Sequence, residues 1–333
     1  MKRPQPALLW RLGEASGRFV KASPGGNRSL YRGFLRKPSS FLSVFNGVHP
    51  WFTASVKLSE MKQLLAERGI RLTKSLGQNF LHDGNQLRRI AETAELSKSD
   101  KVLEIGPGLG PLTELLLAQV GEVLAIEIDA RMVQLLRARC SAPHFHLIHA
   151  DALDFLKRER RDWRGWKLVA NLPYSAASPI LVELGHTEHG PKRMVATLQL
   201  EVAKRLLAEP GDSDYGVLTL LLRLDYEPRA SFTIPPGCFF PPPDVDSACV
   251  CLDRRPTPLL GLAQRATFNR IVKQSFSQRR KMMFKLLKTE LPAEKVQKAF
   301  VGLNIPLQAR AETLTLEQFV QLATIFTKEL TQP

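Results

Sequence analysis

The four residues Asn171-Leu172-Pro173-Tyr174 combine an amide, a stiff backbone and an aromatic ring directly after the apolar run 168–170. The exocyclic amine of adenine is a poor nucleophile because its lone pair is delocalised into the purine ring. Acceptors aimed at the amine protons, here the Asn171 side-chain oxygen and the Leu172 carbonyl, favour a pyramidal nitrogen whose lone pair can attack a methyl donor. The motif therefore suits methylation of an adenine amine.

The last two residues of the motif complete this interpretation. Pro173 fixes the turn and keeps the two acceptors in place. Tyr174 offers a flat face on which a purine removed from its stack can rest. A strand followed by a proline turn and a half-buried tyrosine is also a common structural arrangement. The neighbouring motifs must therefore decide whether this one is functional.

A glycine turn provides the first of these motifs. The buried-strand pattern at residues 101–105 meets Gly106-Pro107-Gly108-Leu109-Gly110, and an apolar helix pattern follows. Strand, glycine turn and helix open a Rossmann-like α/β fold, in which glycines let the backbone approach a ligand and leave amide hydrogens pointing at it. A turn of this kind can also be a mere tight connection, so it predicts a nucleotide only in combination with other residues.

Two acids at the ends of the next strands strengthen the prediction. The strand 122–128 supplies Glu127 at about the distance from the glycine turn where an acid accepts both ribose hydroxyls. The strand 145–150 ends at Asp151, which is placed to accept from an adenine amine. The turn is GxGxG and lacks the GxGxxG spacing of a dinucleotide site, and Asn171 has no role in hydride transfer. We therefore expect S-adenosylmethionine, not NAD, as the cofactor.

A proline-rich run supplies a second aromatic candidate. The pattern from 215 to 252 favours β structure, with the run 239–247, Phe-Phe-Pro-Pro-Pro-Asp-Val-Asp-Ser, between two strands. Consecutive prolines hold an extended arm, which would place Phe239 against the target base opposite Tyr174. The alternative is an aromatic residue packed at a rigid edge turn.

The C-terminal part changes to helix patterns. Residues 267–287 are typical of one amphipathic helix, and further helices are expected at 294–301 and 316–328. The basic run Arg279-Arg280-Lys281 is either a solvated surface or a contact with an RNA backbone, and its expected position near the base pocket favours RNA. The sequence thus predicts a Rossmann-like class I methyltransferase domain over 61–254 and a smaller C-terminal α-helical domain over 255–333.

Composition agrees with a nucleic-acid partner. The 333 residues carry 47 Lys and Arg against 32 Asp and Glu, which gives 47 − 32 = +15 and a pI of about 9.9. No apolar run reaches the ~20 residues of a membrane-spanning helix. The four cysteines lack zinc-type spacing, and three nearby histidines fit half-buried strand positions better than a metal site, so no metal is expected. The cysteines are expected to be reduced thiols.

The first sixty residues differ from the rest. They are rich in Arg, Lys, Ser, Gly and Pro, and Glu14 is the only acid before residue 55. This composition predicts a disordered extension. Two origins remain open, an organellar transit segment or a start codon placed too far upstream, with Met61 as the true start. The second is favoured, and with it a cytoplasmic protein.

Taken together, these motifs resemble the KsgA/RsmA family of small-subunit ribosomal RNA adenine N6,N6-dimethyltransferases. The resemblance runs from about Met61 to the C-terminus and rests on the following segments: 76–83, 104–113, Glu127, Asp151, 171–174, 239–247, 277–281 and the tail at 310–319. It implies that two adjacent adenines near the 3′ end of the RNA each receive two methyl groups. It also implies a monomer that acts on the immature small subunit as a late assembly checkpoint.

The same resemblance assigns site residues. It implies that Asn79, Leu81, Gly106, Glu127, Asp151 and Asn171 hold the cofactor. Departures occur at Ser175-Ala176-Ala177, where the family commonly has Asn-Ile-Ser or Asn-Ile-Thr, and at Met282-Met283, where it has Thr-Leu. Neither departure replaces an expected acceptor or cofactor contact, so positioning is affected more than activity.

Three rival functions remain at this stage. A related enzyme could act on large-subunit RNA, as macrolide-resistance methyltransferases do, although their tail resembles this one less well. A protein-glutamine methyltransferase would carry Asn-Pro-Pro-Tyr and gives no reason for the charge of +15. An assembly or transcription factor could have kept the fold and lost turnover.

Overall fold

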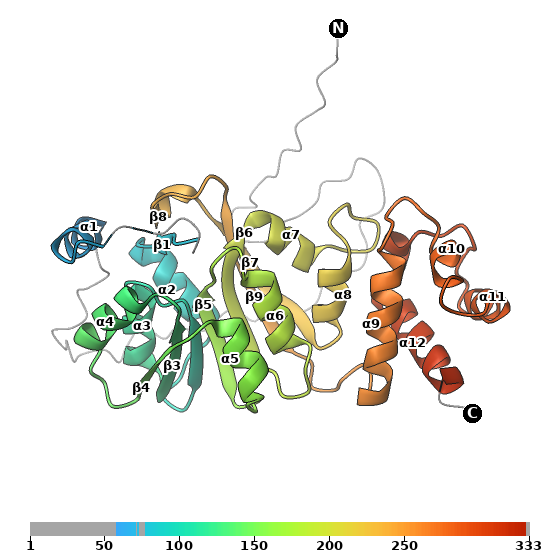
Figure 1. Ribbon diagram of the computed structural model, residues 1–333, viewed down its shortest axis with the longest axis horizontal. Coiled ribbons are helices and arrows are strands. Elements are labelled where there is room, and N and C mark those ends of the chain that lie inside the picture. The colour runs from blue at the N-terminus through green and yellow to red at the C-terminus, as the bar shows by residue number, and fades with distance from the viewer. Residues whose placement is uncertain (1–57, 71, 73–76, 331–333) are drawn as a thin grey trace, which may run out of the picture.

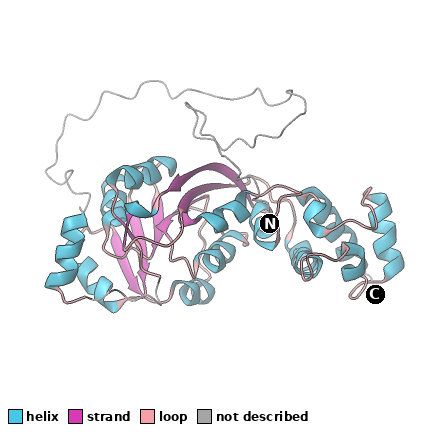
Figure 2. Cartoon of the chain, turned by 90° about the horizontal axis from the view of Figure 1, so that it is seen from above, coloured by secondary structure: helices cyan, strands magenta, loops and turns pink. Residues whose placement is uncertain are grey.

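The computed structural model describes residues 58–70, 72 and 77–330. The predicted N-terminal extension lies outside the described residues except for its last three positions. The described chain forms a sheet covered by helices on both faces, followed by a group of helices at one side (Figures 1 and 2). This arrangement confirms the predicted fold class.

A seven-stranded sheet carries the fold. Its order is β4-β3-β2-β5-β6-β9-β7, with the first five strands parallel and β9 antiparallel to both of its neighbours. The strands are β2 (Lys101–Ile105), β3 (Glu122–Glu127), β4 (Phe145–His149), β5 (Trp166–Asn171), β6 (Arg193–Gln199), β7 (Tyr226–Ile234) and β9 (Ser247–Arg254). Ligands of such sheets bind beyond the carboxyl ends of the parallel strands, so the ends of β2 to β5 are where a site is expected.

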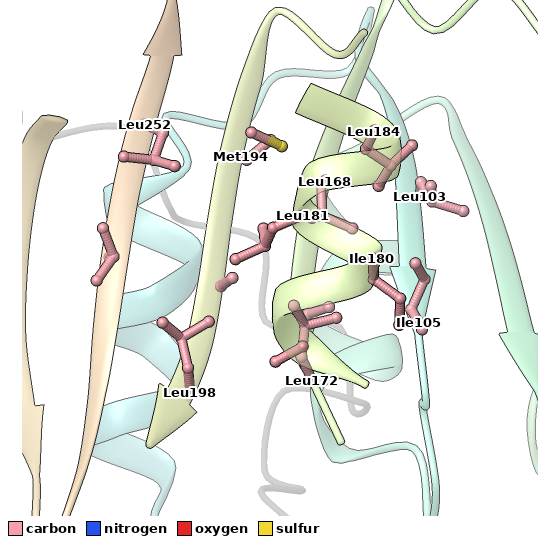
Figure 3. Close-up of a cluster of buried hydrophobic side chains, with 14 of the residues drawn as sticks. Leu103, Ile105, Leu168, Leu172, Ile180, Leu181, Leu184, Met194, Leu198 and Leu252 are labelled. Carbon is pink, nitrogen blue, oxygen red and sulfur yellow. The ribbon is translucent and has the colours of Figure 1, made fainter. Parts of the chain in front are cut away.

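Helices cover both faces because alternate strand residues point to opposite sides. The helices of this part are α1 (Leu58–Glu67), α2 (Gly84–Thr93), α3 (Pro111–Gln119), α4 (Ala130–Arg139), α5 (Ala152–Glu159), α6 (Ala177–Gly185) and α7 (Leu200–Leu207). One core cluster joins α5, α6 and α7 to Leu103 and Leu168, and another joins α2 and α3 to Val102 and Val169. Figure 3 shows α6 lying on the first of these faces, with Leu181 toward the strands.

A two-residue strand pair links two segments near the carboxyl edge of the sheet. β1 (Phe80–Leu81) is antiparallel to β8 (Phe239–Phe240), with Phe80 opposite Phe240 and Leu81 opposite Phe239. The short helix η2 (Pro236–Cys238) precedes β8. The proline-rich run is therefore tied to the loop that enters α2.

The helical lobe comprises α8 (Val217–Arg223), α9 (Leu262–Ser275), α10 (Met283–Leu287), α11 (Ala293–Gly302) and α12 (Leu316–Leu330), with the short helix η3 (Ala311–Thr313). One buried cluster unites them, and it includes residues of α8, such as Leu220 and Leu221, as well as α9 to α12. In Figure 2 these helices stand beside the sheet as a separate group. The predicted boundary near 254 stays a prediction, but α8 shares the apolar core of the later helices.

Two predicted elements are wrong. The β pattern expected from 215 to 252 begins with the helix α8, whose leucines fill the junction between the sheet and the helical lobe. The single helix expected at 267–287 is two helices, because α9 ends at Ser275 and α10 begins at Met283. The Met283 N–H donates to the Ala309 carbonyl at 2.8 Å, a contact with a distant segment that a continuous helix would not make.

Candidate active site

A cavity of about 270 Å³ opens at the carboxyl ends of β2, β3, β4 and β5. It is closed on one side by the loop before α2. The lining includes Gln78, Asn79, Phe80, Gly106, Gly108, Glu127, Ile128, Asp151, Asn171, Leu172, Pro173 and Tyr174. Seven of the nine residues predicted to bind the cofactor or act in catalysis thus meet around one space.

The Asn171 amide has one filled and one open end. Its Nδ2 donates to the Asn79 carbonyl at 3.0 Å, and its Oδ1 is buried without a hydrogen-bond partner among the described residues. Because a carbonyl can only accept, the Asn79 carbonyl must be faced by the Asn171 nitrogen. The amide orientation is thereby fixed, and Oδ1 is left as an open acceptor. A buried acceptor left unpaired costs about 1–3 kcal/mol, which a ligand donor would recover.

The rest of the motif is held by its surroundings. The Leu172 side chain is buried in the core under α6 (Figure 3), and the Leu172 N–H donates to the Thr197 carbonyl at 3.1 Å. The Pro173 carbonyl accepts from the Ala176 N–H at 3.0 Å, which closes the turn into α6. These contacts leave the Leu172 carbonyl free of helix and sheet hydrogen bonds and anchor the backbone that carries it.

The glycine turn lies against the cavity. Gly106, Gly108 and Gly110 have φ of +69°, +59° and +86°, values that residues with a side chain rarely adopt. A Cβ on Gly108 would lie 2.5 Å from the Phe80 ring, so the turn can pass beneath this ring only as glycine. The close approach of backbone that the sequence predicted is therefore present.

Glu127 is buried beside this turn. Its two carboxylate oxygens accept from the Gly108 N–H at 3.0 Å and the Asp129 N–H at 2.9 Å. Burial raises the pKa of Glu127, and these two N–H groups partly oppose the rise. Each oxygen keeps a lone pair for a further donor, as the two hydroxyls of a ribose would require.

Asp151 caps a helix and also lines the cavity. Its side chain accepts from the Asp154 N–H at 3.0 Å and so caps α5. The exposed carboxylate also lines the cavity. The two interpretations of this acid, helix cap and ligand acceptor, are therefore compatible.

Comparison with known proteins places this geometry in a family. A model of the family "Ribosomal RNA adenine dimethylase" matches residues 69–328. The chain belongs to the ribosomal RNA adenine dimethylase family. The ribosomal RNA small subunit methyltransferase A of Listeria monocytogenes serotype 4a is 39% identical over 277 residues, 78% of this chain and 92% of its own length. The enzyme of the same name from Clostridium perfringens strain SM101 is 38% identical over 271 residues, 80% of this chain and 95% of its own.

Solved structures agree. A dimethyladenosine transferase from Plasmodium falciparum has a TM-score of 0.65 at 26% identity and covers 75% of this chain and 98% of its own. The 23S rRNA methyltransferase ErmE has a TM-score of 0.59 at 30% identity and covers 74% and 99%. Both confirm the fold of this dimethylase across the sheet and helices.

The residues around the cavity fit an adenosyl cofactor. Asn171 Oδ1 is an unpaired buried acceptor, Glu127 has open lone pairs beside the glycine turn, and Gly108 passes so close to Phe80 that a Cβ would lie 2.5 Å from its ring. A nucleoside offers hydroxyl and amine donors to match such acceptors. The dimethylase thus presents acceptors, not cations, along this wall.

The sequence analysis assigned no role to Glu104 or Phe80. Glu104, on β2, is 1% exposed, and its Oε2 has no partner among the described residues. Burial, with the nearby charge of Glu127, raises the pKa of Glu104 to about 8. The available signal was an acid within the apolar strand pattern at 101–105, two residues before the first glycine of the turn. Phe80 was an apolar anchor in sequence and is a cavity wall in the structure.

Two predicted site residues do not reach the cavity. Leu81 and Phe239 are each 2% exposed, are paired across β1 and β8, and pack in the cluster of α2 and α3. Phe239 is therefore a packed aromatic, the alternative that its sequence context left open, and its ring does not face Tyr174 across the cavity. The reason is the strand pairing, which turns this side chain to the core.

The basic run lies in the turn between α9 and α10. Arg279, Arg280 and Lys281 are exposed. Arg279 is engaged within the protein, since its side chain bonds the Ser213 carbonyl and the Glu312 carboxylate. The predicted basic helix face is therefore a basic turn in the structure. In this turn, Arg280 and Lys281 are exposed to solvent.

Within 58–70, 72 and 77–330, no group of three or more His, Cys, Asp and Glu side chains is arranged to hold a metal ion. All four cysteines are free and buried. In the same part of the chain, every helix is too short or too polar to cross a bilayer.

Proposed function

We propose that this dimethylase transfers methyl groups from S-adenosylmethionine to the N6 amines of two adjacent adenosines near the 3′ end of small-subunit rRNA. The alignments with the two ribosomal RNA small subunit methyltransferases A span 92% and 95% of the length of those proteins. The single observation that carries the chemistry is the unpaired Oδ1 of Asn171, a residue that lines the cavity and whose Nδ2 is taken by the Asn79 carbonyl.

The cofactor would be held by the acceptors around the glycine turn. Glu127 would accept the ribose hydroxyls, Asp151 the adenine amine, and the Gly106 turn would pass along the adenosyl group. Gln78 and Phe80 would close the loop side of the cavity. When bound, the cofactor supplies a methyl group activated by an adjacent sulfonium.

The protein's part in the reaction is to prepare the target nitrogen. Asn171 Oδ1 and the Leu172 carbonyl accept the two amine protons and draw the nitrogen out of conjugation with the purine. Tyr174 stacks on the flipped base and holds it in line with the methyl group. The bound cofactor would supply the methyl group, and the proton that N6 gives up would leave to water.

The substrate side rests on charge and on the family. A net charge of +15 suits an RNA backbone, and Arg280 and Lys281 are exposed cations without an internal role. We further propose a monomer that acts on the immature small subunit as a late assembly checkpoint. A cytoplasmic location goes with this proposal, and a transit function of the first sixty residues would replace it with an organelle.

One alternative has support of its own. The similarity to a 23S rRNA methyltransferase, at 30% identity, makes large-subunit RNA the second candidate substrate. Its alignment covers 74% of the chain, close to the 78–80% of the small-subunit relatives, which are more similar in sequence at 38–39%. Substrate identity therefore requires a direct experiment.

The test is transfer of labelled methyl to ribosomal subunits. Small subunits and large subunits from a strain without the modification are incubated separately with labelled S-adenosylmethionine and the protein, and the RNA is digested to nucleosides. We expect N6,N6-dimethyladenosine from small subunits alone. Label in large-subunit RNA would support the alternative, and no label in either RNA would refute the enzymatic proposal.

A further inference from the structure

A buried pair of hydroxyls links the catalytic turn to the sheet. The Tyr174 hydroxyl lies 2.5 Å from the Ser247 hydroxyl, although the two residues are 73 positions apart. Ser247 is fully buried. In the described part of the chain, the Ser247 hydroxyl has this one recorded hydrogen-bond partner. The pair therefore joins two segments that the sequence keeps separate.

The two partners differ in rigidity. Ser247 is the first residue of β9, where the backbone is paired on both sides, with Gln199 of β6 and with Ile234 of β7. Tyr174 stands in the turn between β5 and α6, and its neighbour Ser175 is exposed. The sheet thus offers a fixed anchor, and the turn carries the ring that has to be placed.

The hydroxyl contact restricts the ring at its far end. A tyrosine in a turn can rotate about both of its side-chain torsions, and stacking on a base depends on the plane of the ring. A hydrogen bond between the phenol and the hydroxyl of a buried strand residue removes most of this freedom. Burial raises the pKa of Tyr174 and so favours the neutral phenol.

We propose that Ser247 is a positioning residue for methyl transfer, because its hydroxyl sets the plane in which Tyr174 stacks on the target adenine. This inference rests on the proposed function. Ser247 ends the proline-rich run that begins at Phe239, so the run serves the site through its last residue. The ring of Phe239 at its first residue faces the core.

The test is a double-mutant cycle on the full chain. Ser247→Ala, Tyr174→Phe and the double variant are compared for kcat and KM on unmethylated small subunits. The matched control is Ser275→Ala, which removes another buried serine hydroxyl, one in α9 with no partner among the described residues. A hairpin RNA with 2-aminopurine at the target adenine reports stacking on the ring by fluorescence quenching.

We expect each single variant to lower kcat about tenfold, which corresponds to about 1.4 kcal/mol, with KM nearly unchanged. The double variant should equal either single variant, because both remove the same contact. Quenching of 2-aminopurine should fall in all three and stay normal in Ser275→Ala. A purely structural hydroxyl pair would lower the unfolding temperature without changing kcat or quenching.

Two results overturn the inference. One is an active wild-type enzyme whose Ser247→Ala variant keeps normal kcat and quenching. The other is a double variant whose loss is the product of the single losses. If Ser247→Ala does not fold, Tyr174→Phe still tests the idea, since an unchanged kcat in that variant contradicts it. Absence of methyl transfer by the wild-type protein would instead refute the proposed function.

Discussion

The cavity and the junction with the helical lobe both bury polar groups, but they treat them in opposite ways. At the junction, Arg265 of α9 donates to both oxygens of Asp225, at 2.6 and 2.5 Å, and both side chains are at most 8% exposed. In the cavity wall, Asn171 Oδ1 has no partner among the described residues, and on the neighbouring strand β2 the buried Glu104 Oε2 has none either. The bidentate pair holds the junction together, whereas Asn171, the one of these residues that lines the cavity, keeps an acceptor for a ligand donor.

The largest expected effect breaks the closed pair. Arg265→Ala leaves the Asp225 carboxylate buried without its cation, and we expect the free energy of unfolding to fall by about 3–5 kcal/mol. Chemical denaturation followed by circular dichroism measures this loss. Cofactor affinity per folded molecule should stay near the wild-type value, because the cavity lies on the sheet side.

The matched control is Arg270→Ala on the same helix. Arg270 also pairs with an acid, Glu290, but it is 51% exposed. An exposed pair of this kind contributes about 0–1 kcal/mol. Equal losses of unfolding free energy in the two variants would show that burial of the Asp225 pair adds nothing to stability.

The next effect concerns the open acceptor. Asn171→Ala removes Oδ1 and should lower kcat by about 10²–10³-fold, as loss of one preorganised electrostatic group does. Cofactor binding, measured by calorimetry, and the unfolding midpoint should change little, because Oδ1 has no hydrogen-bond partner among the described residues. Asn85→Ala removes an exposed amide on α2 and serves as the control. Retained turnover in Asn171→Ala would refute the assignment.

The second open acceptor predicts a pH effect. Folding raises the pKa of Glu104 from 4.5 to about 8, chiefly through burial. Between these values the native state binds more protons than the unfolded state, so the stability contributed by the protonated carboxyl is complete below pH 4.5 and is lost as the pH rises toward 8. The slope approaches about −1.4 kcal/mol per pH unit for one proton.

Glu104→Gln tests this origin of the slope. The amide has nearly the shape of the protonated acid and cannot ionise, so the variant should be less sensitive to pH from 5 to 8 and more stable than wild type at pH 8. Denaturation curves at several pH values measure both quantities. Parallel pH profiles for the two proteins would assign the ionisation to another group.

The sequence predicted the parts of the fold that local pattern determines. The strands at 101–105 and 166–171 have the predicted bounds, since each is an apolar run closed by glycine or by the Asn171 motif. The helix α8 was missed because its leucines face two cores and show no period. The end of α9 was missed because contacts with Ala309 and Ser213, far along the chain, fix the turn that follows.

The same division holds in the site. Asn171, Glu127 and Asp151 could be predicted because each lies at or just beyond the end of a strand, and the ends of parallel strands meet at one edge. The orientation of Phe239 could not, because it depends on the pairing of two residues with β1. The Asn79 carbonyl that orients Asn171 could not be predicted either, since a backbone contact across 92 positions has no signature in side-chain types.

The smallest expected effect concerns the surface, where neither kind of buried group is involved. Arg280→Ala with Lys281→Ala removes two exposed cations of the turn between α9 and α10. If both neutralise phosphates, the slope of log affinity for RNA against log salt should become less steep by about 2. The control is Lys157→Ala with Arg158→Ala, two exposed cations in the last turn of α5, on the sheet side of the molecule. An equal change in both double variants would mean that RNA responds to total charge, whereas a change in the first alone places the RNA backbone against the helical lobe.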